Sequence, residues 1–243
     1  MHVEIKLLEG LEKLGETNCL NALVSLPNHI RTMYIHSYQS YIWNCMTTSR
    51  LETYGNEKVV VGDLVLESDN ENEVIEGDLY SGSAKVKILE EKDLNSYSIF
   101  DVVLPLPGTD SIFPKNKIGD LYLDLMKKDG IDLQLLIDSN NHFKMRGGYR
   151  KIIHIPKDLS WKVFKYNDAN IPLSLCDSDR LENKADPLSV PDSPFTALVM
   201  EFSLNKASYA TMFLREFTKY SSSNENRDFL VNEWTKKNNK ESK

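Results

Sequence analysis

Residues 36–44 read HSYQSYIWN, a segment in which three aromatic side chains alternate with Ser, Gln and Asn. Pro27 precedes this segment and Gly55 follows it, and these residue types favour the first turn and the end of a helix. The sequence therefore predicts one long helix between them. At helical spacing, one side of that helix carries Tyr34, Tyr38, Tyr41, Ile42 and Cys45. Because aromatic rings bury large areas, we interpret this side as core.

The rest of the chain mixes helical and strand patterns, which predicts an α+β fold. Apolar residues at helical spacing predict helices at 3–14, 19–26, 117–128 and 208–220. Short β-branched or alternating runs predict strands at 59–66, 84–89, 100–108, 151–155, 161–166 and 196–204. We expect residues 151–155 and 161–166 to open a new sheet. The polar stretch 167–194 is typical of a surface loop.

The composition describes a globular intracellular protein. The chain has 243 residues, 41% of them hydrophobic and 27% charged, enough for one large or two smaller domains. No run approaches the roughly 20 apolar residues of a membrane span, and the N-terminus lacks a signal-peptide pattern. The three cysteines are scattered, which favours free thiols in a reducing compartment. A net charge of −7 argues against nucleic-acid binding over the whole surface.

One segment departs from this acidic balance. Residues 144–151, KMRGGYRK, contain four positive side chains and no acid. Two glycines and a tyrosine lie between these cations. From the residues alone, the sequence predicts a local site for a flexible polyanion.

Catalytic motifs are few. The sequence has no glycine-rich phosphate loop and no nucleophile elbow. Its five histidines lack ligand spacing, so we expect no metal site. His36 is interpreted as a packing or hydrogen-bonding residue of the aromatic helix. Asp63 and Asp101 lie near predicted strand ends, where catalytic acids occur, but we favour turn and cap roles for both.

Several segments, taken in order, resemble the TruD family of RNA pseudouridine synthases, in particular its eukaryotic branch. They span about residues 20–220, and the closing FSL, SYAT and LRE elements are the most specific. The segments are IRTMYIHSYQSYIWN, VGDLVL, FDVVLPLPG with FPKNKIG, GGYRKIIHIPKDLSW and FSLNKASYATMFLRE.

The resemblance implies a domain organisation within the α+β class. Residues 1–145 correspond to the family's inserted, TRUD-type domain, incomplete at its N-terminus. Residues 146–220 correspond to the C-terminal part of the catalytic α+β domain, to which they supply strands and a helix. Residues 221–243 form a polar tail.

The resemblance also implies an activity, the isomerisation of uridine to pseudouridine in tRNA or other RNA, without metal or cofactor. It implies action in the nucleus or the cytoplasm, and RNA rather than a membrane as the partner. The family carries its catalytic aspartate in a Gly-x-Lys-Asp type segment, which this sequence lacks. We therefore expect the nucleophilic aspartate upstream of Met1 and no catalytic nucleophile in this chain.

Six residues are the candidates for binding the substrate. Phe202 is expected to line the pocket for the flipped base, supported by Tyr209 and Arg215 from the adjacent helix. Core packing explains Phe202 and Tyr209 equally well, and an ion pair would explain Arg215. The candidate RNA phosphate contacts are Arg146, Arg150 and Lys151.

Three alternatives remain open at this point. The chain could be a non-catalytic RNA-binding module, a truncated or fragment product that is inactive alone, or a scaffold protein with no RNA role. If the catalytic sheet is only partly encoded, its uncovered apolar face should make residues 151–220 prone to association. The sequence does not indicate an oligomeric state.

Overall fold

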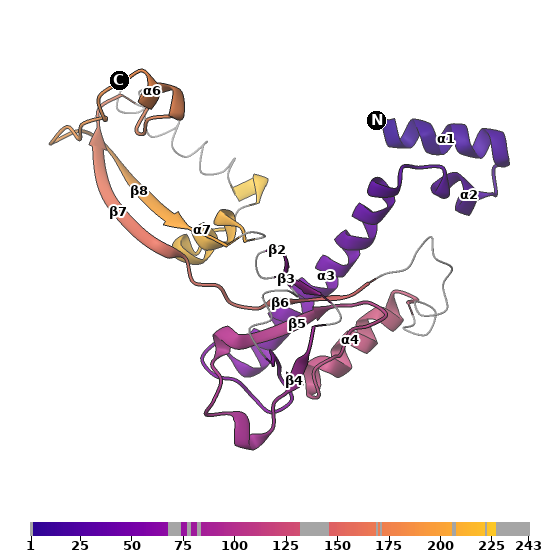
Figure 1. Ribbon diagram of the computed structural model, residues 1–243. Helices are drawn as coiled ribbons and strands as arrows, with labels where there is room; N and C mark the ends of the chain where they lie inside the picture. The colour runs from indigo at the N-terminus through magenta and orange to yellow at the C-terminus, as the bar shows by residue number, and fades with distance from the viewer. Residues whose placement is uncertain are drawn as a thin grey trace. The chain divides into compact units, whose positions relative to one another are not determined.

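The computed structural model of the protein describes residues 2–67, 74–76, 79–81, 84–131, 146–168, 170, 172–205, 208–221 and 223–226. The chain divides into two compact units, Met1–His154 and Ile155–Lys243. Helices and antiparallel sheets occur in both, so the predicted α+β class is confirmed (Figure 1). Most of the predicted tail, 221–243, lies outside the described residues.

The helices of the first unit match the predicted ones to within two residues at each end, the largest difference being the helix predicted at 19–26, which ends at Val24. They are α1 (His2–Leu14), α2 (Cys19–Val24), α3 (Asn28–Tyr54) and α4 (Lys117–Lys128). Pro27 precedes α3, and Gly55, with φ of 77°, ends it by donating its N–H to the carbonyl of Leu51. Asn116 caps α4, because its side-chain oxygen accepts from the Ile118 N–H at 3.0 Å.

Six short strands form one antiparallel sheet in the order β2-β3-β6-β5-β1-β4. They are β1 (Leu64–Leu66), β2 (Val74–Glu76), β3 (Leu79–Ser81), β4 (Val86–Ile88), β5 (Val102–Leu106) and β6 (Gly148–Lys151). Two 3₁₀ turns, η2 (Glu91–Asp93) and η3 (Ile99–Asp101), lie between β4 and β5.

Two predicted strands were wrong in their bounds. Of residues 59–66 only the last three form a strand, because Gly62 adopts φ of 87° and the Asp63 carboxylate accepts from the Val60 N–H at 3.0 Å. In place of the strand predicted at 151–155, the structure has β6, which begins at Gly148 and ends at Lys151. It pairs with β5 and therefore belongs to the first sheet rather than opening a new one.

The core of the first unit lies on both faces of this sheet. On one face, side chains of α3 and α4 pack on Val65, Val102 and Leu104. The buried residues that these two helices contribute are Ile42, Met46, Ile118, Tyr122 and Met126. The opposite face forms a smaller cluster of Leu64, Ala84, Val103 and Tyr149.

The buried side of α3 overlaps the predicted one only in part. Tyr34 and Tyr41 are 49% and 52% exposed, so the interpretation as core was wrong for these two rings, whereas Ile42 of the same side is buried. The buried stripe is instead Gln39, Ile42, Met46 and Arg50. Two of these four side chains are polar, and each is held by hydrogen bonds inside the unit.

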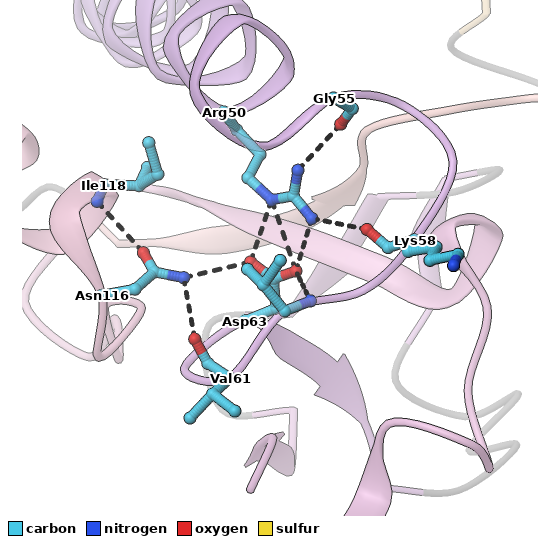
Figure 2. A network of polar contacts seen from close by, with 8 residues as sticks. Arg50, Gly55, Lys58, Val61, Asp63, Asn116 and Ile118 are labelled. Carbon is cyan, nitrogen blue, oxygen red and sulfur yellow. Dashed lines mark hydrogen bonds and ion pairs between the residues drawn. The ribbon is translucent and has the colours of Figure 1, made fainter. Parts of the chain in front are cut away.

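Arg50 and Asp63 form a buried ion pair at the end of α3 (Figure 2). The guanidinium donates from Nη2 to Asp63 Oδ2 at 2.7 Å and from Nε to Oδ1 at 3.0 Å, and both side chains are at most 1% exposed. Arg50 also donates to the carbonyls of Gly55 and Lys58. Asn116 Nδ2 donates to Asp63 Oδ1 at 3.1 Å. The pair therefore joins α3, the following turn and the cap of α4.

Replacing Asp63 with Asn should lower the free energy of unfolding by about 3–5 kcal/mol, because it leaves the Arg50 charge buried without a counter-ion. Urea denaturation of the chain measures this loss. Asp101→Asn is the matched control: Asp101 accepts from the N–H and the hydroxyl of Ser98, and asparagine keeps an acceptor oxygen there, so the change should cost less than about 1 kcal/mol. Equal losses in the two variants would contradict this account of the ion pair.

The second unit contains a long two-stranded ribbon, β7 (Lys157–Tyr166) and β8 (Phe195–Ser203), with α7 (Ala210–Thr218) near one end (Figure 1). A short helix, α6 (Asp177–Leu181), lies in the predicted surface stretch between the strands. The Phe202 ring of β8 contacts the Phe213 ring of α7, with centroids 4.6 Å apart. This contact ties the helix to the ribbon.

One face of the ribbon is apolar and open to solvent. Trp161 is paired with Met200, and Val163 with Leu198, so these four side chains share a face. Trp161 is 68% exposed and Val163 is 54% exposed. Among the described residues of this unit, the only buried hydrophobic side chain is Phe164, which points to the opposite face. We call the face of Trp161, Val163, Leu198 and Met200 the open face.

The open face should make the chain self-associate as its concentration rises, because exposed apolar sheet surface favours burial against another surface. The double variant Trp161→Lys/Leu198→Lys should reduce this association in sedimentation velocity. Leu188→Lys is the control, because Leu188 is 83% exposed but lies outside the two strands. A monomeric parent chain, or equal reduction by the control, would contradict the prediction.

Candidate functional site

The three predicted RNA-contacting cations lie at or near β6, but they do not share one surface. Arg150 is paired with Leu104 of β5, and Lys151 with Val103. Leu104 belongs to the face that α3 and α4 cover, whereas Val103 belongs to the opposite face. Arg150 and Lys151, both half-buried, therefore point to opposite faces of the sheet. Arg146 precedes the strand and is exposed.

Arg150 is held against α3. Its guanidinium carbon lies 5.4 Å from the centroid of the Trp43 ring, a distance typical of a cation–π contact. The Trp43 Nε1–H donates to the carbonyl of Leu104 at 3.2 Å, which fixes the indole on β5. The Arg150 Nε is buried and has no hydrogen-bond partner in the described part of the chain. This geometry gives Arg150 a packing role under α3.

The carboxylates of Asp63 and Asp101, the two acids near strand ends, both accept hydrogen bonds from other residues of the first unit. Asp63 is occupied by the Arg50 ion pair and by the Val60 N–H, and it is 1% exposed (Figure 2). Asp101 accepts from the N–H and the hydroxyl of Ser98. The turn and cap roles predicted for them are confirmed, although the ion pair of Asp63 was not foreseen.

The tyrosines of α3 form a partly exposed stripe beside α4. The Tyr38 hydroxyl donates to Asp129 Oδ2 at 3.1 Å, and the Tyr38 and Tyr41 ring centroids lie 6.4 Å apart. Burial, followed by the hydrogen bond to Asp129, raises the pKa of Tyr38 to about 12. Tyr38 therefore stays protonated at physiological pH and links the two helices.

The second unit carries Phe202, Tyr209 and Arg215. Phe202 is half-buried and in contact with Phe213, whereas Tyr209 is 67% exposed at the start of α7. Arg215 is exposed, and its Nη1 lies 3.9 Å from the Met212 sulfur. The three residues are thus on or next to one strand–helix junction, but only Phe202 is packed.

Two buried polar residues of α3, Gln39 and Arg50, were missed by the sequence reasoning. Both fall on the same helical face as Ile42 and Met46. This alignment could have predicted that both residues are buried and hydrogen-bonded, since a polar side chain within an apolar stripe requires a buried partner.

No group of three or more His, Cys, Asp or Glu residues within the described ranges is arranged to hold a metal ion. The described helices include none that is long and apolar enough to cross a membrane. A cavity of about 300 Å³ lies between α1 and α2 and contains none of the six candidate residues.

Comparison with known proteins identifies the family. Residues 1–217 match the family model described as "tRNA pseudouridine synthase D (TruD)". The chain belongs to the TruD family. A TruD relative from Homo sapiens, "Pseudouridylate synthase 7 homolog", is 42% identical over 96% of this chain. "Multisubstrate pseudouridine synthase 7" of Schizosaccharomyces pombe is 31% identical over 95% of it. The predicted resemblance to the eukaryotic branch of TruD is therefore confirmed.

The chain spans about a third of the length of these TruD relatives, 33% of the human protein and 36% of the fission-yeast protein. A crystal structure of a putative TruD protein from Methanosarcina mazei has the same fold over 90% of this chain and 45% of its own, with a TM-score of 0.62 and 23% identity.

Replacing Arg150 with Ala should lower the free energy of unfolding by about 2 kcal/mol, because the cation–π contact and the packing of the side-chain stem are both lost. Arg146→Ala removes an exposed side chain of the same type and should change the free energy of unfolding by less than about 0.5 kcal/mol. Urea denaturation compares the two variants. Equal effects would show that Arg150 has no packing role.

Proposed function

We propose that the chain is part of an RNA pseudouridine synthase, which isomerises uridine in RNA to pseudouridine. The observation that carries this proposal is the TruD match over residues 1–217, together with 42% identity to a protein named as a pseudouridylate synthase. The relatives are about three times as long as this chain. We therefore assign the chain a share of the active site rather than the whole of it.

In this proposal the first unit corresponds to the inserted domain and the second unit to the C-terminal part of the catalytic domain. We place the boundary after His154 rather than at residue 145, because β6 pairs with β5. The open face of the β7–β8 ribbon is then the surface that packs against the rest of the catalytic domain. Burial of Trp161 and Val163 there would supply the apolar core that the described part of the second unit lacks.

The chemistry of the reaction assigns roles to the second unit. An enzyme that acts on a base within RNA takes that base out of the stack and needs an apolar wall to hold it. Phe202 is the proposed wall, because Phe213 fixes its ring on β8. Tyr209 and Arg215 are proposed to contact the nucleotide from α7, where both side chains are exposed.

In the first unit, Arg146 is the proposed phosphate contact. It is exposed, and it forms no ion pair with any acid of the described residues. Arg150 is proposed to act indirectly, through its stacking on Trp43, and Lys151 to contact RNA separately from the opposite face. RNA as the partner favours action inside the cell, in the nucleus or the cytoplasm.

A chimera tests the enzymatic role. In the human relative, the third that matches this chain is replaced by this chain, and pseudouridine is measured by mass spectrometry after digestion of uridine-containing RNA. The chimera should form pseudouridine, and Phe202→Ala should lower its kcat/KM at least about tenfold, the order expected for the loss of one base–aromatic stack. Leu188→Ala is the surface control in the same unit. A folded, RNA-binding chimera without product would refute the proposed role.

Salt dependence tests the RNA contact. Arg146→Ala should weaken binding of single-stranded uridine-containing RNA to the chain and reduce the slope of log K against log salt by about one, as for one lost phosphate contact. Arg150→Ala, which removes the same charge from a half-buried position, should leave the slope unchanged. An unchanged slope for Arg146→Ala would contradict its assignment.

A further inference from the structure

Gln39 is a buried polar residue whose hydrogen-bonding groups all have partners. It lies in α3 and is 2% exposed. Its Nε2 donates to the carbonyl of Pro107 at 2.9 Å and to the carbonyl of Arg146 at 2.6 Å. Because the amide nitrogen uses both protons in this way, Oε1 is the acceptor for the His36 ring, whose Nδ1 lies 2.9 Å away. The orientation of the Gln39 amide is therefore fixed.

One of the two carbonyls that Gln39 bonds belongs to a peptide group that is hydrogen-bonded at both its C=O and its N–H. The carbonyl of the Arg146–Gly147 peptide accepts from Gln39, and the N–H of the same peptide donates to Asp110 Oδ1 at 2.8 Å. A Cβ at Gly147 would collide with the Ser111 hydroxyl, and a Cβ at Gly108 would collide with the Gly147 backbone. Two side chains from different elements thus hold the peptide that follows the exposed Arg146.

We infer that Gln39 is a positioning residue that orients the Arg146–Gly147 peptide and thereby presents the Arg146 side chain to RNA. The inference rests on the proposed function, because it takes Arg146 as a phosphate contact. A backbone that is already ordered before binding reduces the conformational entropy lost when the arginine meets its phosphate. Gln39 therefore influences the affinity for RNA only by orienting Arg146.

A double-mutant cycle distinguishes positioning from general stability. Gln39→Met keeps the size of the side chain but cannot hydrogen-bond to the two carbonyls. It should weaken binding of uridine-containing RNA about two- to tenfold, the order expected for one side chain that must be ordered on binding. In an Arg146→Ala background it should have no further effect on affinity.

Tyr122→Phe is the matched control for this cycle. The Tyr122 hydroxyl is buried and donates to the carbonyl of Pro105 at 2.7 Å, two residues from the Pro107 carbonyl that Gln39 bonds. Its removal deletes a comparable buried hydrogen bond without touching Arg146, so RNA affinity should not change. A loss of affinity by Gln39→Met that persists in the Arg146→Ala background would overturn the inference.

Trypsin supplies a readout that needs no RNA. Cleavage after Arg146, mapped by mass spectrometry, attacks the peptide bond that Gln39 and Asp110 hold. Gln39→Met should raise the rate of this cleavage about fivefold, which corresponds to the loss of one hydrogen bond to this peptide, worth about 1 kcal/mol. Asp110→Ala, a surface variant, should do the same, and Asp110→Asn, which keeps an acceptor oxygen, should restore protection. Unchanged cleavage in both Gln39→Met and Asp110→Ala would overturn the inference.

The failures of the two proposals can be told apart. If the parent chain does not bind RNA, Arg146 has no phosphate to contact and the inference is wrong. If the chain binds RNA and the cycle behaves as expected but the chimera forms no pseudouridine, only the enzymatic role is refuted.

Discussion

The buried ion pair between Arg50 and Asp63 is the interaction on which the first unit depends most. Burying two charges is costly, and the pair is stable only because its remaining hydrogen-bonding groups are also satisfied, by the carbonyls of Gly55 and Lys58, the Val60 N–H and the Asn116 amide. Through these bonds one guanidinium fixes the end of α3, the turn before β1 and the cap of α4. Gln39 lies three turns earlier on the same face of α3. The orientation that Arg50 imposes on the helix therefore also determines where the Gln39 amide meets Pro107 and Arg146.

The sequence predicted the parts of this fold that local physics controls. Pro27 and Gly55 act within one helical turn, so the bounds of α3 follow from residue type. A strand at 59–66 was predicted from β-branched residues, but Gly62 and the carboxylate of Asp63 turn the chain before Leu64, so only 64–66 form a strand. The side of α3 that faces the core could not be read from aromatic content, because long-range partners make burial of Gln39 and Arg50 favourable while Tyr34 and Tyr41 remain exposed.

The candidate sites show the same division between local and long-range information. The basic segment was recognisable from composition, but alternation along β6 separates Arg150 from Lys151, and only the register with β5 reveals this. Trp43 could be assigned to the aromatic helix but not to Arg150, which comes from a distant strand. In the second unit, Phe202 was a candidate for both pocket and core, and its contact with Phe213 is compatible with either role.

The central claim is that this TruD chain contacts RNA through the Arg146 end of β6 in the first unit and through the Phe202–Arg215 region in the second. Photo-cross-linking with RNA that contains 4-thiouridine, followed by mass spectrometry of the attached peptides, tests both contacts at once in the chimera. The account predicts cross-links in the peptides that contain Arg146–Lys151 and Phe202–Arg215. Cross-links confined to α1, α2 or the surface stretch around α6 would contradict it.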